Sequence, residues 1–207
     1  MKSAFVTMLG MQDKMNQKVH AEWIAQQFEW YRAIWIECGE LVEHYGYKWW
    51  KKQTPDIDQV KLEVIDIWHF GMSALFTDTL TQEQLAQQMA DALQGYTYQG
   101  AGVREATEAL AQHSLASKGF SVPLFWDLLH AVDMSFEDLY RQYVGKNVLN
   151  FFRQDHGYKD GSYIKQWQGR EDNEHLVEIL AELDSNSDRY SDDVYRALSE
   201  RYRTLAQ

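Results

Sequence analysis

Apolar residues recur along most of the chain at the three- to four-residue spacing of one helix face. This spacing predicts helices at about 3–18, 21–45, 56–76, 81–93, 103–117, 121–132, 135–152, 173–183 and 191–205. No stretch alternates apolar and polar residues at the period of two that is typical of strands. We therefore predict an all-α fold, either a helical bundle or an interlocked homodimer of bundles.

Local signals mark where several of these helices begin and end. Thr81 and Ser135 each begin a capping box, in which side chains satisfy the first free backbone amides of a helix. Thr54 and Pro55 predict the start of the third helix as its N-cap and its first helical residue. Gly46 ends the second helix, because glycine readily takes the left-handed conformation that closes a helix.

The length of 207 residues favours one domain, which we place at 1–207, with the stretch 77–135 as a helical insertion. Only two prolines, Pro55 and Pro123, occur, so long helices are permitted nearly everywhere. Residues 154–171 break the helical periodicity, and three glycines alternate there with cationic and aromatic side chains. This stretch is therefore predicted to be a loop.

The formal net charge of −11 argues against binding to nucleic acid or to an anionic membrane. The single cysteine, Cys38, excludes an intrachain disulfide and suits a reducing compartment. The N-terminus lacks the long apolar region of a signal peptide, and no run is long enough to span a membrane. We therefore expect a cytoplasmic protein.

Two acidic pairs, Glu37 with Glu40 and Glu63 with Asp66, are the main candidates for chemistry. Each pair is spaced i, i+3 and projects from one face of a predicted helix that is otherwise apolar. Four carboxylates in a helical core would repel one another and lose solvation, so they require a counter-charge. A divalent ion is the simplest one, and oxygen ligands suit Mg²⁺ better than zinc. The alternative is that both pairs lie on solvated helix faces.

Three segments around these acids, ECGEL at 37–41, KWWK at 48–51 and EVIDIWHF at 63–70, form a recognisable set. They resemble the all-α dimeric dUTPases, a branch of the MazG-like nucleoside triphosphate pyrophosphohydrolases. The stretch NFFRQDHGYKDGSYIKQWQGREDN at 150–173 resembles the C-terminal phosphate-binding motif of that family, and MQDKMN at 11–16 resembles its first motif. The resemblance spans about residues 8–176.

The resemblance implies an enzyme, a dUTP diphosphatase, that hydrolyses dUTP and also dUDP to dUMP with two or three Mg²⁺ ions per site. It implies a homodimer whose ligands are deoxyuridine nucleotides. The metal ligands it implies are Glu37, Glu40, Glu63 and Asp66. Among these, Glu37 would orient and deprotonate the attacking water.

Contacts to the base and sugar are expected from the first and third helices and the connector between the acidic helices. Amides offer both donors and acceptors to a pyrimidine edge, and an aromatic ring can stack on the base. The expected residues are Gln12, Asn16, His69, Phe70 and Trp49, or its neighbour Trp50. The alternatives are solvated amides, a histidine satisfied in the core and tryptophans that only fill a helix junction.

Contacts to the phosphates are expected from the glycine-containing loop. Glycines let backbone amides approach a phosphate, and cations neutralise it. The expected residues are Arg153, Tyr158, Lys159, Tyr163, Lys165, Arg170 and Asn173. A surface loop with scattered cations is the alternative. Two other functions stay open: hydrolysis of dCTP or a modified pyrimidine nucleotide, and nucleotide binding by a helical module without turnover.

Overall fold

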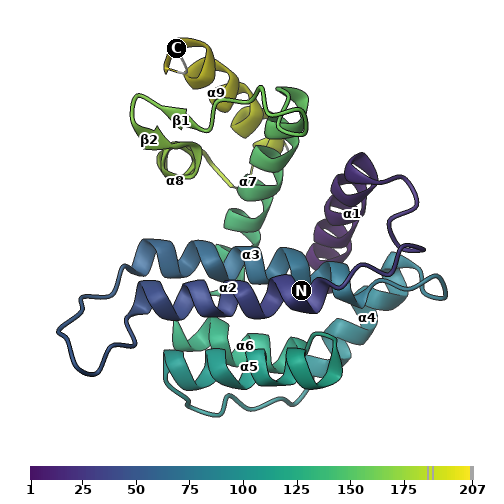
Figure 1. Cartoon of the computed structure of the whole chain (residues 1–207). Coiled ribbons are helices and arrows are strands. Elements are labelled where there is room, and N and C mark those ends of the chain that lie inside the picture. Colours follow the sequence, from purple (N-terminus) through teal and green to yellow (C-terminus); the bar gives the residue numbers. More distant parts are fainter. Residues whose placement is uncertain (186, 188, 206–207) are drawn as a thin grey trace. The chain divides into compact units, whose positions relative to one another are not determined.

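The helical pattern of the sequence is realised in the computed structural model, which describes residues 1–185, 187 and 189–205 (Figure 1). The elements in chain order are α1 (Lys2–Val19), α2 (Trp30–Tyr45), α3 (Ile57–Leu75), α4 (Gln82–Leu93), α5 (Val103–Ser117), α6 (Val122–Ala131), α7 (Phe136–Asp155), β1 (Gln166–Trp167), β2 (Arg170–Glu171), α8 (Asp172–Glu182) and α9 (Tyr190–Leu205). The prediction of an all-α fold is confirmed. None of the described helices is long and apolar enough to cross a membrane.

The chain forms two compact units, Met1–Leu139 and Tyr140–Gln207. In the first unit α2 and α3 lie side by side, joined by the loop 46–56, and α5 packs against α2 (Figure 1). The helix α1 contacts both α3 and α4, and α6 contacts α5. Because neighbours cover α3 on several sides, three polar residues of this helix, Glu63, His69 and Ser73, are buried.

Aromatic packing fixes the position of α3 in the first unit. The ring of Trp68 is fully buried and stacks on Phe125 of α6 at a centroid distance of 4.7 Å. One turn along α3, a Cβ at Gly71 would approach the ring of Phe120 to 2.5 Å, so only glycine allows this close contact. These contacts pack α3 closely against Phe120 and α6.

The helix starts agree with the predicted capping signals at two of three places. Thr81 accepts a hydrogen bond from the Gln84 backbone, and the Gln84 side chain accepts one from the Thr81 backbone, which completes the capping box of α4. Ser135 and Asp138 form the same reciprocal pair at the start of α7. Local spacing alone determines this motif, so the sequence was sufficient to predict it.

The predicted start of α3 at Thr54 and Pro55 is wrong. The N-cap is Asp56, whose carboxylate accepts a hydrogen bond from the backbone N–H of Gln59 at 3.2 Å, and the helix begins at Ile57. A carboxylate also interacts favourably with the positive end of a helix dipole. Asp56 therefore outcompetes the threonine as the cap.

The prediction of one long helix from residue 21 is also wrong. Residues 21–27 form turns, and α2 begins only at Trp30. The indole N–H of Trp23, which is almost fully buried, donates to Asp13 of α1 at 2.9 Å. This hydrogen bond holds residues 21–27 against α1. A helix that continued from residue 21 into α2 would not allow this contact.

The second unit contains a short hairpin that the sequence did not predict. In β1 and β2, Gln166 pairs with Glu171 and Trp167 pairs with Arg170. The turn residues Gln168 and Gly169 both have positive φ angles, +50° and +77°, as two-residue hairpin turns require. Strands of two residues are too short to show an alternating pattern. The fully buried ring of Trp167 anchors the hairpin.

Candidate active site

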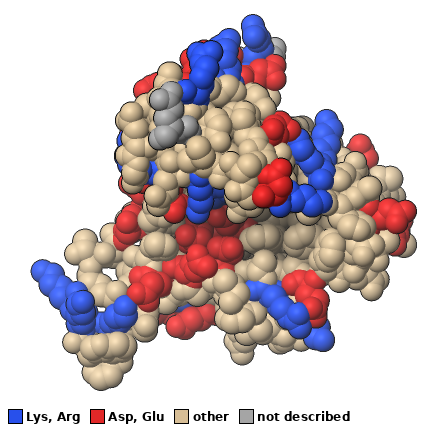
Figure 2. All heavy atoms as spheres, turned by 45° about the horizontal axis from the view of Figure 1, so that its top comes forward, with Lys and Arg blue, Asp and Glu red and all other residues tan. Residues whose placement is uncertain are grey.

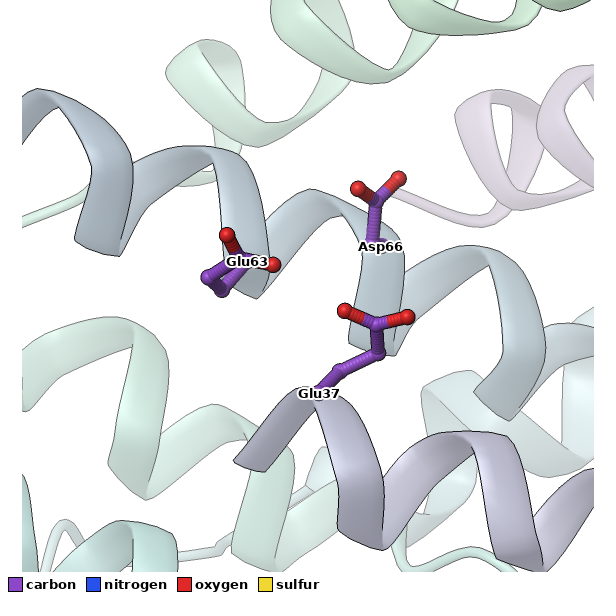
Figure 3. Close-up of side chains that lie close together, drawn as sticks. All are labelled: Glu37, Glu63 and Asp66. Atoms are coloured by element: carbon purple, nitrogen blue, oxygen red, sulfur yellow. The ribbon is translucent and has the colours of Figure 1, made fainter. Parts of the chain in front are cut away.

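Three carboxylates converge where α2 and α3 lie side by side. Glu37 points from α2 toward α3, and Glu63 and Asp66 come from successive turns of α3 (Figure 3). One oxygen of each carboxylate lies within 4.8 Å of the others. Glu63 is buried, whereas Glu37 and Asp66 are half-buried. The spacing i, i+3 places the two acids of α3 on one face, and the packing of α2 supplies the third.

Glu40, the fourth expected ligand, does not join this cluster in the part of the chain that the structure describes. It is exposed, and the group of potential ligand atoms contains only Glu37, Glu63 and Asp66. Its negative charge nevertheless helps to raise the pKa of Glu37. Glu40 as a metal ligand therefore stays a prediction.

Burial and like charges both act on Glu37. Burial raises its pKa most, followed by the negative charge of Asp66 and then by a hydrogen bond and the charge of Glu63, and together they raise the pKa to about 8. The structure thus gathers acidic oxygens from two helices at close range. Such a set of hard oxygen donors fits Mg²⁺, which prefers oxygen ligands and relieves their repulsion.

Cys38 and His44 are neighbours of the carboxylate cluster. The pKa of the Cys38 thiol is raised to about 12, chiefly by burial and also by the charge of Glu37, so the thiol stays protonated and serves packing. His44 Nε2 lies 3.5 Å from a carboxylate oxygen of Glu63. His44 lies seven residues, about two helical turns, beyond Glu37, so both side chains lie on the same face of α2.

The surface around the site is acidic in one region and basic in another. Figure 2 shows acidic side chains gathered on the face in view, while lysines crowd the loop between α2 and α3. In that loop Trp49 is 91% exposed, and its ring meets Trp50 edge-to-face at 5.5 Å. The structure therefore places this expected base contact on an exposed loop rather than beside the carboxylates.

Other expected base contacts form one buried polar network between α1 and α3. Gln12 Nε2 donates to Asn16 Oδ1 at 3.1 Å, and Gln12 Oε1 lies 2.8 Å from His69 Nδ1. Ser73 joins both amides, with its Oγ 3.0 Å from Gln12 Nε2 and 2.9 Å from Asn16 Nδ2. The sequence did not identify Ser73, although its position one turn after His69 on α3 was the available signal.

Phe70, the remaining expected base contact, is half-buried beside this network. Its ring stacks on Trp30 at a centroid distance of 6.2 Å and an interplanar angle of 28°. Trp30 in turn meets Trp23 edge-to-face at 6.0 Å. Phe70 thus belongs to an aromatic cluster at the start of α2, which a nucleotide base can extend by stacking.

Arg153, one of the expected phosphate contacts, forms an ion pair with a carboxylate inside the second unit. Arg153 donates two hydrogen bonds of 2.8 Å to the carboxylate of Asp172, and the hydroxyl of Tyr163 donates another of 2.8 Å. Asp172 is fully buried, which by itself raises its pKa, but the hydrogen bonds and charge of Arg153 outweigh burial and lower the pKa. This cluster ties α7, the loop and the start of α8 together.

Two more of the expected cations also have carboxylate partners. Lys165 lies 3.1 Å from Glu171, and Arg170 lies 2.8 Å from Glu178. These side chains are roughly half-exposed, so solvent weakens both pairs. Lys165 and Arg170 can therefore exchange their partners for another anion at a small energetic cost.

The remaining expected phosphate contacts differ in accessibility. Lys159 and Tyr158 are exposed, and no ion pair to Lys159 is found within residues 1–185, 187 and 189–205. Asn173 is half-buried, and its Oδ1 has no hydrogen-bond partner in the described part of the chain. Lys159 is thus the most accessible cation of the loop.

Comparison with known families identifies the chain. A family model described as dUTPase matches residues 4–158, which include all four expected metal ligands and the network around Ser73. The match ends before Tyr163, Lys165, Arg170 and Asn173. No curated protein sequence matches the chain. Enzymes of this family are metal-dependent hydrolases of dUTP, and the carboxylate cluster provides oxygens that can hold a metal ion. Because the match covers well over half of its length, the chain belongs to the all-α dUTPase family and is a dUTP diphosphatase.

Proposed function

We propose that the enzyme converts both dUTP and dUDP to dUMP with Mg²⁺ held by Glu37, Glu63 and Asp66, and with Glu40 as a further ligand. The observation that carries this proposal is the convergence of three carboxylates within 4.8 Å inside the segment that matches the family. Two or three Mg²⁺ ions per site are expected from the family resemblance. When bound, the ions supply positive charge that neutralises the phosphates and polarises the reacting phosphorus.

We assign Glu37 to the attacking water. Its carboxylate is half-buried and points into the cluster, where a water can donate a hydrogen bond to it (Figure 3). Glu37 orients the water and accepts its proton as the oxygen attacks phosphorus. The new bond between the water oxygen and phosphorus replaces the anhydride bond between the α- and β-phosphates, which separates dUMP from pyrophosphate in dUTP or from phosphate in dUDP.

We assign base contact to Gln12, Asn16, His69 and Phe70, with Trp49 stacking from the exposed loop. Three of the four residues on α1 and α3 share one hydrogen-bond network, which supports a common role. Their polar atoms offer donors and acceptors that match the edge of uracil. Trp49 can stack on the base because its side chain is 91% exposed and so accessible to a ligand.

We assign phosphate contact to Lys159 first, because its ammonium group is exposed. Tyr158, Lys165 and Arg170 follow, the last two by exchanging exposed carboxylate partners. Asn173 can use its buried Oδ1 side for a hydrogen bond from a ligand or a water. We also assign phosphate contact to Arg153 and Tyr163. Their hydrogen bonds to Asp172 hold both side chains in position, and contact with the phosphates requires that these bonds are retained.

We also propose a cytoplasmic homodimer. The single cysteine suits a reducing compartment. The large apolar side chains that remain exposed on α2 favour association with a second copy.

The overall proposal is tested by measuring phosphate and pyrophosphate release from dUTP, dUDP, dCTP and dTTP, with Mg²⁺ and with EDTA. We expect turnover of dUTP and dUDP with Mg²⁺ and none with EDTA. A higher kcat/KM for dCTP would replace uracil by cytosine as the recognised base. Binding of nucleotide without release of either product would favour the module without turnover.

The role of Glu37 is tested by Glu37→Gln, which keeps the shape of the side chain and removes the base. We expect kcat to fall by about 10³-fold with the helical circular dichroism spectrum unchanged. Glu43→Gln is the matched control, because Glu43 lies on the same helix, is exposed and pairs only with Lys48 among the described residues. Full activity of Glu37→Gln would refute the assignment.

A further inference from the structure

A single buried hydroxyl joins α3 to both amides of α1. Ser73 is 2% exposed, and its Oγ lies 3.0 Å from Gln12 Nε2 and 2.9 Å from Asn16 Nδ2. The same Oγ lies 3.0 Å from the backbone oxygen of His69, one turn earlier on α3. Ser73 thus has three close polar neighbours, which is the full capacity of a hydroxyl.

The direction of each of these hydrogen bonds follows from the backbone carbonyl. A carbonyl oxygen only accepts, so the one O–H of Ser73 must donate to His69 O. Both lone pairs of Ser73 Oγ are then left as acceptors. They require N–H donors, which the amide nitrogens of Gln12 and Asn16 provide.

This arrangement also determines which ring nitrogen of the neutral His69 imidazole carries the hydrogen. Because Gln12 turns its nitrogen to Ser73, its Oε1 faces His69 Nδ1 at 2.8 Å. Nδ1 must therefore carry the hydrogen, and in the neutral ring Nε2 is the acceptor nitrogen. The bonds close a circuit that begins at the backbone oxygen of His69 and ends at its ring.

Reversal of the Asn16 amide would break two of these hydrogen bonds, and reversal of the Gln12 amide would break three. Gln12 Nε2 also donates to Asn16 Oδ1 at 3.1 Å. If Asn16 turned over, its oxygen would face the acceptor lone pairs of Ser73, and its nitrogen would face the nitrogen of Gln12. Two attractive contacts would become repulsive, so Ser73 holds both amides in one orientation.

We propose that Ser73 is a positioning residue that sets the specificity of the enzyme for uracil over cytosine. This inference rests on the proposed function, in which Gln12, Asn16 and His69 contact the base. At N3, uracil has an N–H donor and cytosine has a lone pair. At C4, uracil has an oxygen acceptor and cytosine has an amino donor. A reversed amide or the other imidazole tautomer suits the wrong base. Ser73 excludes these reversed forms without touching the substrate.

The kinetic test compares Ser73→Ala with Ser73→Thr, which restores a hydroxyl. The measured quantity is the kcat/KM for dUTP divided by that for dCTP. We expect this ratio to fall about tenfold in Ser73→Ala, the effect of losing about one hydrogen bond. The change should appear mainly in KM, because the carboxylate cluster is untouched, and Ser73→Thr should recover most of the ratio.

Ser114→Ala is the matched control for burial. Ser114 is fully buried on α5 in the same unit, and its hydroxyl has no hydrogen-bond partner in the part of the chain that the structure describes. We expect its ratio of kcat/KM values to equal that of the unmodified enzyme. An equal loss in Ser73→Ala and Ser114→Ala would assign the effect to packing and overturn the proposal.

A second readout needs no substrate. Nitrogen-15 NMR of the unmodified protein should show neutral His69 with the hydrogen on Nδ1, and Ser73→Ala should give a mixture of tautomers. A hydrogen on Nε2 in the unmodified protein would overturn the proposal, even if Ser73→Ala fails to fold. If the unmodified enzyme does not prefer dUTP, the proposed function fails instead, while the tautomer still reports whether Ser73 sets the network.

Discussion

At the scale of single residues, the fully buried Asp172 and the half-buried Glu37 have pKa values shifted in opposite directions. Burial acts on both, but Asp172 has Arg153 at 2.8 Å and its pKa is lowered. Glu37 has Asp66 and Glu63 instead, and its pKa is raised to about 8. The partner therefore decides the sign of the shift. Asp172 is an acid whose charge is already balanced, whereas Glu37 still requires a cation.

The raised pKa of Glu37 predicts how the stability of the metal-free protein depends on pH. The carboxyl binds its proton more tightly in the folded chain than in the unfolded chain, with a pKa of about 8 against 4.5. Its contribution to stability is therefore complete below about pH 4.5 and is lost as the pH rises through about 8. Solvent screens the half-buried side chain, so we expect the Tm in EDTA to fall by roughly 2–8 °C over this range.

The measurement compares thermal unfolding of the unmodified protein and Glu37→Gln at pH 5 and pH 9. Other groups titrate in both proteins, so the difference between their Tm values isolates Glu37. Glu37→Gln should gain stability relative to the unmodified protein as the pH rises. Mg²⁺ should restore the Tm of the unmodified protein at pH 9 more than at pH 5. A difference that does not change with pH would contradict this account of the cluster.

At the scale of elements, the sequence predicted most helices because their signals are local. The capping box at Thr81, for example, involves only residues within one helical turn and does not depend on the rest of the fold. The start of α2 was missed because Trp23 bonds to Asp13 on another helix, and no local pattern reports that contact. Tertiary contacts decide such boundaries.

The residues of the candidate site also differ in whether a local pattern or a tertiary contact identifies them. Spacing placed Glu63 and Asp66 on one face, and the α2–α3 hairpin brought Glu37 to them. Glu40 has the same i, i+3 spacing from Glu37, but its side chain is exposed, and spacing alone does not determine that outcome. Ser73 was missed because its position one turn after His69 indicates a role only when its hydrogen-bond partners on α1 are known.

The connection between α7 and α8 depends on the buried pair of Arg153 and Asp172. In Asp172→Asn the guanidinium stays buried at 12% exposure without a balancing charge. We expect the variant to lose about 3 kcal/mol of unfolding free energy, measured by urea denaturation. Lys165→Gln is the control, because it breaks a pair that is nearly half-exposed on both sides, and should cost less than about 0.5 kcal/mol. Equal stability of the two variants would show that the buried pair does not hold this segment.

At the scale of the whole molecule, the residues that match the family can be compared with the two compact units of the structure. The match at 4–158 covers the first unit, Met1–Leu139, from residue 4 onward, and so includes the three clustered carboxylates. The helix α7 continues from this unit into the second, Tyr140–Gln207, without an interruption in its sequence pattern. Periodicity reports the helix but not the division within it, so the two units were not visible in the sequence.

The surface of α2 predicts that two copies of the chain associate. Trp35 and Ile36 are 37% and 41% exposed, and one turn later the space above Gly39 is open. Apolar side chains beside an exposed glycine form a surface that another helix can approach closely. We expect light scattering to give about twice the chain mass of 24.3 kDa.

Trp35→Glu should lower the mass toward that of one chain, because it places a charge in the proposed contact. Leu115→Glu is the matched control, since Leu115 is 51% exposed on α5 and lies on a different helix. The unmodified protein and Leu115→Glu should keep the double mass at the same concentration. With a net charge of −11 on each chain, two copies repel one another, so raising the salt concentration should strengthen the association. A single-chain mass for the unmodified protein, or a double mass retained by Trp35→Glu, would rule out this surface as the contact.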